Sequence, residues 1–438
     1  MKNNSDIRVR IAPSPTGNLH IGTTRTALFN YLFAKQNGGT FVIRIEDTDK
    51  ERSKPEFEQN ILDGLTWLGL TWDEFYKQSD RTEIYKNYLK KLIDDGFAYE
   101  SKEEVTEEGQ RDSVIRFKNP NKAVTFTDMI RGEITFDTTE LGDFVIAKSI
   151  EEPLFHLAVV VDDHEMKISH VIRGEDHISN TPRQILIGQA IGATQPTYAH
   201  IPLILSKERK KLSKRDGATS LVEYKNIGYL KDALINFLAF LGWHPEGDVE
   251  ILSIEELISQ FDITRIQKGG AIFDLEKLNW FNKEYINQIP ESDFVNIIKE
   301  QSGVSITHPT LITLIKERIT VFSDIAPLLT PEGEFGPLLH DISITDYSKT
   351  IWKDSNSEQT KEYLAHVVSI LESADDFTGS NLKDLIWDYA TEKGRGAVLW
   401  PTRFALSGQD KSPDPFTLME ILGKEKSLVR LRNAIEKI

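Results

Sequence analysis

The start of the chain shows a strand pattern, a helix pattern and a second strand pattern, and this order restricts the fold more than any other stretch. Residues 7–11 alternate apolar side chains with arginine as a short strand does, and Pro13 and Pro15 end the pattern because proline lacks the backbone N–H that sheet pairing requires. Residues 22–35 carry apolar side chains at helical spacing, and residues 41–45 alternate as a strand does. A strand–helix–strand unit predicts a parallel sheet that binds ligands at the carboxyl ends of its strands.

Length and composition indicate a globular protein of several domains. The chain has 438 residues, of which 39% are hydrophobic and 27% charged. Residues 1–6 are polar, so we expect no signal peptide, and no apolar run approaches the roughly 18 residues of a membrane span. We therefore expect no membrane partner. The sequence has no cysteine, which excludes disulfides, cysteine nucleophiles and thiolate zinc sites and favours a reducing cytoplasmic location.

The net charge of -16 argues only modestly against a nucleic-acid partner. Contacts with phosphates require lysine and arginine, and a basic surface is the usual sign of them. The chain nevertheless has 52 lysine and arginine residues, enough to line one groove while acidic residues cover the remaining surface. An RNA partner therefore stays open.

The middle of the chain changes from a mixed pattern to a strand-rich one and back. Strands are predicted at residues 114–117, 133–136, 144–147 and 157–161, and a Glu-rich loop or short surface helix at 101–112. A strand at 168–173, a helix at 182–191 and a strand at 201–205 restore the α/β pattern. From Tyr229 onward the pattern is helical, with one apolar face at 363–371, 382–389 and 416–422. The predicted fold class is α/β: a Rossmann-type parallel-sheet domain split by a β-rich insertion and followed by an all-helical C-terminal region.

Two motifs about 190 residues apart carry the chemistry. His20 and Gly22 lie between a proline turn and a helix, where the ring and the first helical amides can face one anion. Lys211 and Lys214 lie in a strongly basic loop that follows a predicted strand. Taken alone, the first motif is more typical of a helix cap and the second of a solvated surface. Together they predict an ATP site whose cations stabilise charge on the phosphates during attack by a carboxylate.

The two motifs resemble the signature sequences of class I aminoacyl-tRNA synthetases, and specifically of the bacterial-type glutamyl-tRNA synthetases. His20-Ile21-Gly22-Thr23 and Lys211-Leu212-Ser213-Lys214-Arg215 match the two class signatures. The glutamyl assignment depends on residues 25–30, 44–49, 160–164, 171–177 and 180–184. The likeness runs from Arg8 to the C-terminus and is weaker after about Tyr285.

The resemblance implies a two-step ligase. Glutamate and ATP give glutamyl-adenylate and pyrophosphate, and the terminal ribose of tRNA(Glu) then attacks the adenylate. Mg²⁺ is expected with ATP. The implied catalytic residues are His20, Lys211 and Lys214; the implied ATP-binding residues are Pro13, His20, Gly22, Asp176, Lys211 and Lys214; the implied glutamate-binding residues are Arg10, Ala12, Ser14, Glu46, Phe155 and Arg173. Arg10 and Arg173 are expected to face the carboxylates of glutamate, and Ser14 and Glu46 its amino group.

The resemblance also implies five parts along the chain. They are the first half of the catalytic domain (1–85), an acceptor-binding insertion (86–165), the second half with the lysine loop (166–215), a helical stem-contact domain (216–290) and a helical anticodon-binding domain (291–438). The sequence does not say which residues read the anticodon.

Three departures from the family pattern matter. Phe155 stands where many relatives have a tyrosine, so one polar contact near the amino-acid pocket is in doubt. The stretch from Tyr99 to Val114 is short, and some relatives hold zinc there through cysteines that this chain lacks, so we predict no metal ligands and no zinc. Asp216 stands where a histidine is common, which we interpret as neutral.

Four other functions fit the sequence less well than a glutamate ligase does. A glutamine enzyme fits residues 44–49 less well, and the short tRNA-modifying relative ends before any anticodon domain. An inactive RNA-binding paralogue tends to lose the phosphate-contacting residues, which are present here. An unrelated nucleotidyltransferase would not need the helical C-terminal half. Charging of tRNA(Gln) in addition to tRNA(Glu) stays open, and a monomer is expected although the sequence does not determine the oligomeric state.

Overall fold

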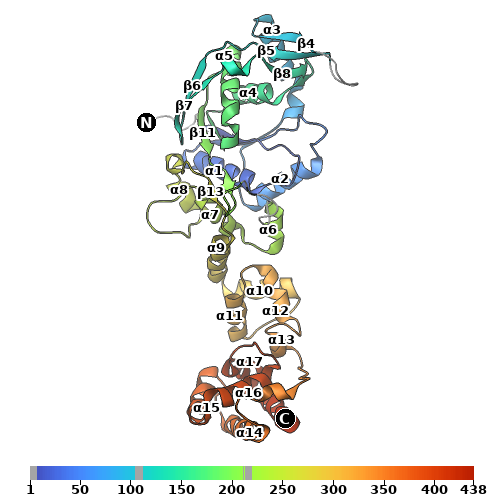
Figure 1. Ribbon diagram of the computed structural model, residues 1–438, viewed down its shortest axis with the longest axis vertical. Helices are drawn as coiled ribbons and strands as arrows, with labels where there is room; N and C mark the ends of the chain where they lie inside the picture. Colours follow the sequence, from blue (N-terminus) through green and yellow to red (C-terminus); the bar gives the residue numbers. More distant parts are fainter. Residues whose placement is uncertain (1–6, 104–111, 211, 213–219) are drawn as a thin grey trace. The chain divides into compact units, whose positions relative to one another are not determined.

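The structure is a computed structural model that describes residues 7–103, 112–210, 212 and 220–438 (Figure 1). Its contacts divide the chain into two compact units, Met1–Asn282 and Lys283–Ile438. The five-part division expected from the sequence is finer than this and stays a prediction. Residues 104–111 of the expected Glu-rich loop lie outside the described residues.

The N-terminal strand–helix–strand prediction is confirmed. Strands β1 (Arg8–Ile11), β2 (Thr40–Ile45) and β3 (Glu74–Lys77) form a parallel sheet in the order β1-β2-β3. Helix α1 (Ile21–Gln36) connects the first two strands. It is buried on nearly every side because it is packed between the sheet and the helices α7 (Lys231–Phe240) and α8 (Ile254–Gln260).

The second half of the sheet domain continues beside β1. Strand β10 (His170–Gly174) pairs in parallel with β11 (Thr197–Ile201), and α5 (Thr181–Ile191) connects them. The backbone amide of Ser169 donates to the carbonyl of Arg8 at 2.9 Å, which places the start of β10 next to β1. The antiparallel hairpin of β6 (Ala123–Asp128) and β7 (Gly132–Asp137) extends this sheet from β11. The carboxyl ends of β1, β2 and β10 therefore face one region.

The β-rich insertion is also found, with one correction. Strands β4 (Ala98–Lys102), β5 (Ser113–Phe117), β8 (Phe144–Ser149) and β9 (Glu152–Pro153) form an antiparallel sheet. The strand predicted at residues 157–161 is wrong, because these residues lie in helix α4 (Phe155–Glu165). Its β-branched valines have strand propensity, but the helix is buried on nearly every side, and tertiary packing outweighs that weak local preference.

The strand predicted at residues 201–205 is wrong in its extent. Strand β11 ends at Ile201, and Pro202 interrupts the backbone pairing because it has no N–H to donate. The chain then forms β12 (Ile204–Leu205), which pairs in parallel with β13 (Ala271–Ile272) in a separate small sheet.

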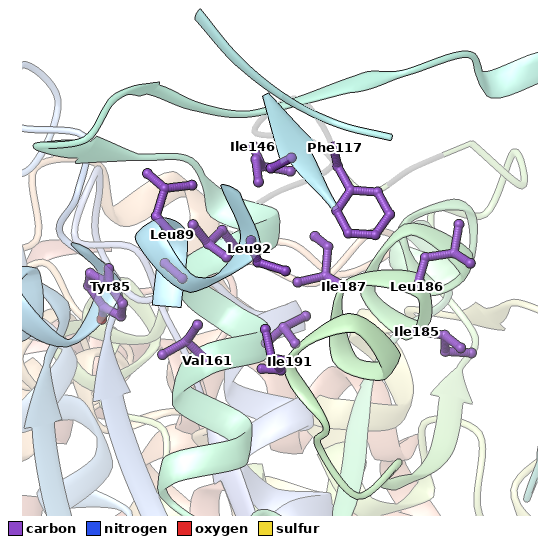
Figure 2. Close-up of a cluster of buried hydrophobic side chains, with 14 of the residues drawn as sticks. Tyr85, Leu89, Leu92, Phe117, Ile146, Val161, Ile185, Leu186, Ile187 and Ile191 are labelled. Carbon is purple, nitrogen blue, oxygen red and sulfur yellow. The ribbon is translucent and has the colours of Figure 1, made fainter. Parts of the chain in front are cut away.

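One hydrophobic core joins the insertion to the parallel sheet (Figure 2). Leu89 of α3 (Thr82–Asp94), Val161 of α4 and Ile187 of α5 meet in it, and each is fully buried. Phe117 and Ile146 reach the same core from the antiparallel sheet. Because burial of one such side chain contributes roughly 1.5 to 3 kcal/mol, this core holds α4 rigidly against the sheet.

The remaining elements are mainly helical. The first unit also contains α2 (Pro55–Trp67), α6 (Leu221–Ile227) and the start of α9 (Leu275–Gln288). The second unit contains α10 (Glu291–Ser302), α11 (Pro309–Arg318), α12 (Ile325–Leu329), α13 (Gly336–Leu339), α14 (Ser357–Ser373), α15 (Gly379–Lys393), α16 (Arg395–Ser407) and α17 (Pro415–Lys437). The helices predicted in this half are confirmed. Among the described residues, no helix is long and apolar enough to span a bilayer.

Candidate active site

A cavity of about 480 Å³ lies where β1 and β10 end and α1 begins. It brings together residues that are up to 202 positions apart in the sequence, from Arg10 to Leu212. Every site residue expected from the sequence that the structure describes lines this cavity: Arg10, Ala12, Pro13, Ser14, His20, Gly22, Glu46, Phe155, Arg173 and Asp176. Lys211 and Lys214 lie outside the described residues, whereas Leu212 between them also lines it.

His20 is the N-cap of α1 and is half-buried at the cavity wall. Its Nδ1 atom accepts a hydrogen bond from the amide of Gly22 at 3.0 Å. In the neutral ring the proton is therefore on Nε2, which can donate to an anion. The helix N-terminus adds a positive potential in the same place.

Arg44 at the end of β2 organises one side of the site, and sequence analysis did not select it. Its guanidinium is fully buried, 2.6 Å from Asp163 and 3.0 Å from Glu46. Asp162 lies at 3.6 Å. Burial alone would lower the pKa of Arg44, but the three carboxylates outweigh it and raise the pKa. Arg44 is thus a cation whose charge is balanced within the fold.

The carboxylates in this network differ in their pKa. Burial raises the pKa of Glu46 more than Arg44 lowers it. For Asp163, burial also raises the pKa, but Arg10 and Arg44 together outweigh burial and lower it. Asp163 has two arginine partners within hydrogen-bond distance, whereas Glu46 has only Arg44. The number of close cations decides the direction of each shift.

Arg10 of β1 shares Asp163 with Arg44. Its Nε and Nη2 donate to the two oxygens of Asp163 at 3.1 and 3.3 Å. Asp163 lies on α4, the segment predicted as a strand, so the wrong element assignment concealed this partner. The repeated aspartate at 162–163 was the available signal, because a buried helix carries charged residues only where cations face them.

Arg173 at the end of β10 has a different environment. It is only 7% exposed, and it forms no ion pair with any residue that the structure describes. Its hydrogen bonds go to neutral acceptors: His200 Nε2 at 3.2 Å, Gln184 Oε1 at 2.8 Å and Thr181 Oγ1 at 2.9 Å. Burial, followed by repulsion from Arg10, lowers the pKa of Arg173 to about 10. Asp163 and Glu46 oppose this shift from a distance but do not outweigh it. No ion pair among the described residues therefore balances the charge of Arg173 directly.

Four arginines and three carboxylates in and beside this network leave one net positive charge. Asp162, the third carboxylate on Arg44, also pairs with Arg81 at 2.7 Å. Arg10, Arg44 and Arg81 are thus balanced by Asp163, Glu46 and Asp162, whereas Arg173 has no ion-pair partner among the described residues. A ligand with one net negative charge would complete the balance. A guanidinium can bind a carboxylate through two parallel hydrogen bonds, and Arg173 has N–H groups beyond the three that it donates.

The remaining wall is apolar and aromatic. The ring of Phe155 lies 5.9 Å from that of His177, and Val159 lines the same cavity. Burial, followed by Arg173, lowers the pKa of His177 to about 4, so this ring is neutral near pH 7. Sequence analysis did not select His177 or Val159. No metal site is seen in the described ranges, where no group of three histidine or acidic side chains is placed to hold an ion.

A parallel sheet whose strand ends meet an anion-binding helix N-terminus is typical of nucleotide-binding α/β proteins. Residues 6–111 and 100–280 match the family described as tRNA synthetases class I (E and Q), catalytic domain, and residues 267–435 match an anticodon binding domain. The chain belongs to the glutamate–tRNA ligase family of these synthetases.

Named relatives resemble the chain over its whole length. The glutamate–tRNA ligase of Heliobacterium modesticaldum is 40% identical over 98% of this chain and 97% of its own length. The glutamate–tRNA ligase of Bacillus subtilis is 38% identical over 98% of this chain and 99% of its own length. The crystal structure of a glutamate tRNA ligase from Elizabethkingia meningosepticum in complex with its amino acid superposes with a TM-score of 0.87, at 33% identity and 99% coverage of both chains.

Proposed function

We infer that this chain is an enzyme that attaches L-glutamate to tRNA(Glu) with ATP as a substrate. The first step forms glutamyl-adenylate and releases pyrophosphate, and the second transfers glutamate to the terminal adenosine ribose of the tRNA. The observation that carries the choice of amino acid is the uncompensated charge of Arg173 beside the balanced pairs of Arg10 and Arg44. Glutamate has one net negative charge, whereas glutamine has none.

We assign the carboxylates of glutamate to Arg10 and Arg173. Ser14, Glu46 and the backbone at Ala12 receive its amino group. Support for Glu46 comes from its burial at the cavity wall with Arg44 on one oxygen, because a buried carboxylate favours a further cation. Phe155 provides an apolar wall.

We assign ATP to the opposite end of the cavity. His20 donates from Nε2 to a phosphate oxygen, and Gly22 keeps side-chain atoms out of the nucleotide's path, since a Cβ there would point at His20. Pro13 and Asp176 bound the nucleotide. We assign to Lys211 and Lys214 the stabilisation of the charge that develops on the phosphates. This interaction lowers the activation barrier only if it is stronger in the transition state than in the ground state.

The remaining partners follow from the same proposal. Mg²⁺ accompanies the ATP phosphates, as this hard cation prefers oxygen ligands, and zinc is not expected. The insertion binds the acceptor end of the tRNA. The helical second unit binds the anticodon of the same tRNA. A monomer in the cytoplasm stays a prediction, and tRNA(Gln) is a second substrate to be tested.

Amino-acid-dependent ATP–pyrophosphate exchange tests the proposal. Purified protein is assayed with glutamate or glutamine, each with and without tRNA(Glu). We expect exchange with glutamate and far less with glutamine. His20→Ala should lower exchange about a hundredfold or more, because a transition-state contact of this kind contributes roughly 3 kcal/mol. His244→Ala removes an exposed histidine outside the cavity and is the matched control.

The outcomes separate the alternatives. An inactive RNA-binding paralogue would bind tRNA and show no exchange with either amino acid. A glutamine enzyme would show the reverse preference. Formation of glutamyl-tRNA(Gln) as well as glutamyl-tRNA(Glu) would identify a ligase with both tRNA substrates.

A further inference from the structure

Arg173 is held from behind by a histidine that can act only as an acceptor. The Nε atom of Arg173 donates to Nε2 of His200 at 3.2 Å, and Thr181 Oγ1 lies 3.2 Å from the same nitrogen. A guanidinium has donors and no acceptor. Nε2 of His200 must therefore carry a lone pair, which places the proton of the ring on Nδ1.

Asp128 holds the other nitrogen of that ring. Its Oδ2 lies 2.7 Å from Nδ1 of His200 and also accepts the His200 amide at 3.0 Å. Its Oδ1 accepts the amides of Ile130 and Arg131, each at 3.0 Å. Asp128 and His200 are both completely buried. The carboxylate is thus fixed by backbone amides and in turn selects the Nδ1–H form of His200.

The surroundings of His200 oppose a second proton on the ring. Arg173 on β10 and Arg131 between β6 and β7 both act on it with repulsive charge. His177 after β10 is neutral near pH 7, and Tyr198 on β11 stacks on His200 with ring centroids 6.0 Å apart. Asp128 is the opposing anion. Burial is the largest cause, and the net result is a lowered pKa of His200.

We propose that the Asp128–His200 pair is a positioning element for the amino-acid site, which fixes the guanidinium of Arg173 for a ligand carboxylate and does so only while His200 is neutral. The proposal rests on the proposed function, in which Arg173 binds a carboxylate of glutamate. A protonated ring would present Nε2–H to Arg173, and two donors would then face each other. The Asp128–His200 pair therefore sets the affinity for glutamate and the preference for glutamate over glutamine, although it contacts neither amino acid.

Three substitutions test this pair against a purely structural role. His200→Gln keeps an acceptor near the position of Nε2, and Asp128 retains its three backbone amides. His200→Leu removes the acceptor. Asp128→Asn keeps shape and size but offers an amide donor to Nδ1, which favours the ring form with the proton on Nε2. His170→Gln on the same strand as Arg173 replaces a half-buried histidine outside the cavity and is the control.

The measurement is the KM for glutamate and for ATP in the exchange assay, with thermal unfolding as a check of folding. We expect KM for glutamate to rise about tenfold or more in His200→Leu and Asp128→Asn, the cost of one misplaced charged hydrogen bond. The KM for ATP should stay within about twofold, because ATP is bound elsewhere in the cavity. His200→Gln should recover most of the loss, and the control should match the wild type.

A pH series gives a readout that loss of folding would not mimic. In the wild type, KM for glutamate should rise as the pH falls below the usual histidine range and His200 takes up a proton. In His200→Gln this rise should be absent, and in the His170→Gln control it should remain.

Any of three results would overturn the proposal. The first is a folded His200→Leu or Asp128→Asn variant with wild-type KM for glutamate. The second is an equal rise of the KM for glutamate and the KM for ATP, and the third is a His200→Gln variant as impaired as His200→Leu, since each of these two indicates a structural role. A wild-type protein without glutamate-dependent exchange would instead refute the proposed function itself.

Discussion

The two sides of the active-site cavity hold their buried arginines in opposite ways. On the β1–β2 side, Arg44 and Arg10 are surrounded by Asp163, Glu46 and Asp162, so their charge is balanced before any ligand arrives. On the β10–β11 side, Arg173 has only neutral acceptors. The first arrangement stabilises the fold and the second keeps a charge for the substrate.

The pKa values of the arginines express the same contrast. The carboxylates raise the pKa of Arg44, whereas burial lowers that of Arg173 to about 10. A lowered arginine pKa means that the folded protein disfavours the charge, which is a cost that a bound carboxylate removes. Binding sites commonly carry such a cost, because groups arranged for a ligand are not arranged for stability alone.

The largest predicted effect breaks the balanced side. Arg44→Met leaves three buried carboxylates without their shared cation and should lower the free energy of unfolding by about 4 to 5 kcal/mol. Urea unfolding monitored by circular dichroism measures this. Arg52→Met removes an exposed pair with Asp49 and should change the free energy by less than about 1 kcal/mol. Similar losses in both variants would contradict the central role of Arg44.

The next prediction tests the uncompensated side. Arg173→Gln should raise the KM for glutamate steeply and reduce the preference for glutamate over glutamine by about a hundredfold, or roughly 3 kcal/mol. Its unfolding free energy should change by less than about 2 kcal/mol, because no counter-charge is stranded. The ratio of kcat/KM for the two amino acids is the measurement. If the Arg173→Gln variant keeps the wild-type ratio of kcat/KM for glutamate to kcat/KM for glutamine, the side-chain carboxylate of glutamate does not bind at Arg173.

Asp163 gives a prediction about pH. Asp163→Asn should lower the unfolding free energy by about 2 to 3 kcal/mol at pH 7, since Arg10 and Arg44 lose a charged acceptor. The pKa of Asp163 in the folded protein lies below its ordinary value of about 3.9. Its contribution is therefore complete above that value and is lost as the pH falls through the lowered pKa.

Urea titrations from pH 7 to pH 3 compare Asp163→Asn with the wild type. We expect a constant difference down to about pH 5 and convergence below about pH 4. A difference that grows as the pH falls would contradict the assignment of a lowered pKa to Asp163.

The smallest predicted effect concerns the apolar wall. Phe155→Tyr adds a hydroxyl of the kind that many relatives have, and it should change kcat/KM for glutamate by about 1 kcal/mol or less, the contribution of one hydrogen bond. The preference for glutamate over glutamine should stay within a few-fold of the wild type. A much larger gain would show that selectivity depends on this wall as well as on the arginines.

Much of the fold could be predicted because local patterns and packing agree. The strand–helix–strand start, the α/β return after the insertion and the helical C-terminal half all follow from periodicity and from proline and glycine positions. Helix α4 could not be predicted in this way. Its run of three valines is typical of a strand, and only the core formed with Leu89 and Ile187 makes it a buried helix.

The sequence by itself determined which residues are available for the chemistry. His20, Gly22, Glu46 and Arg173 could be selected from motifs, and all of them line one cavity. Only the tertiary structure decided which charges are balanced. Asp163 and His200 reach Arg10 and Arg173 from elements far along the chain, and the effect of a charge depends on distance and burial, which spacing in a sequence does not reveal.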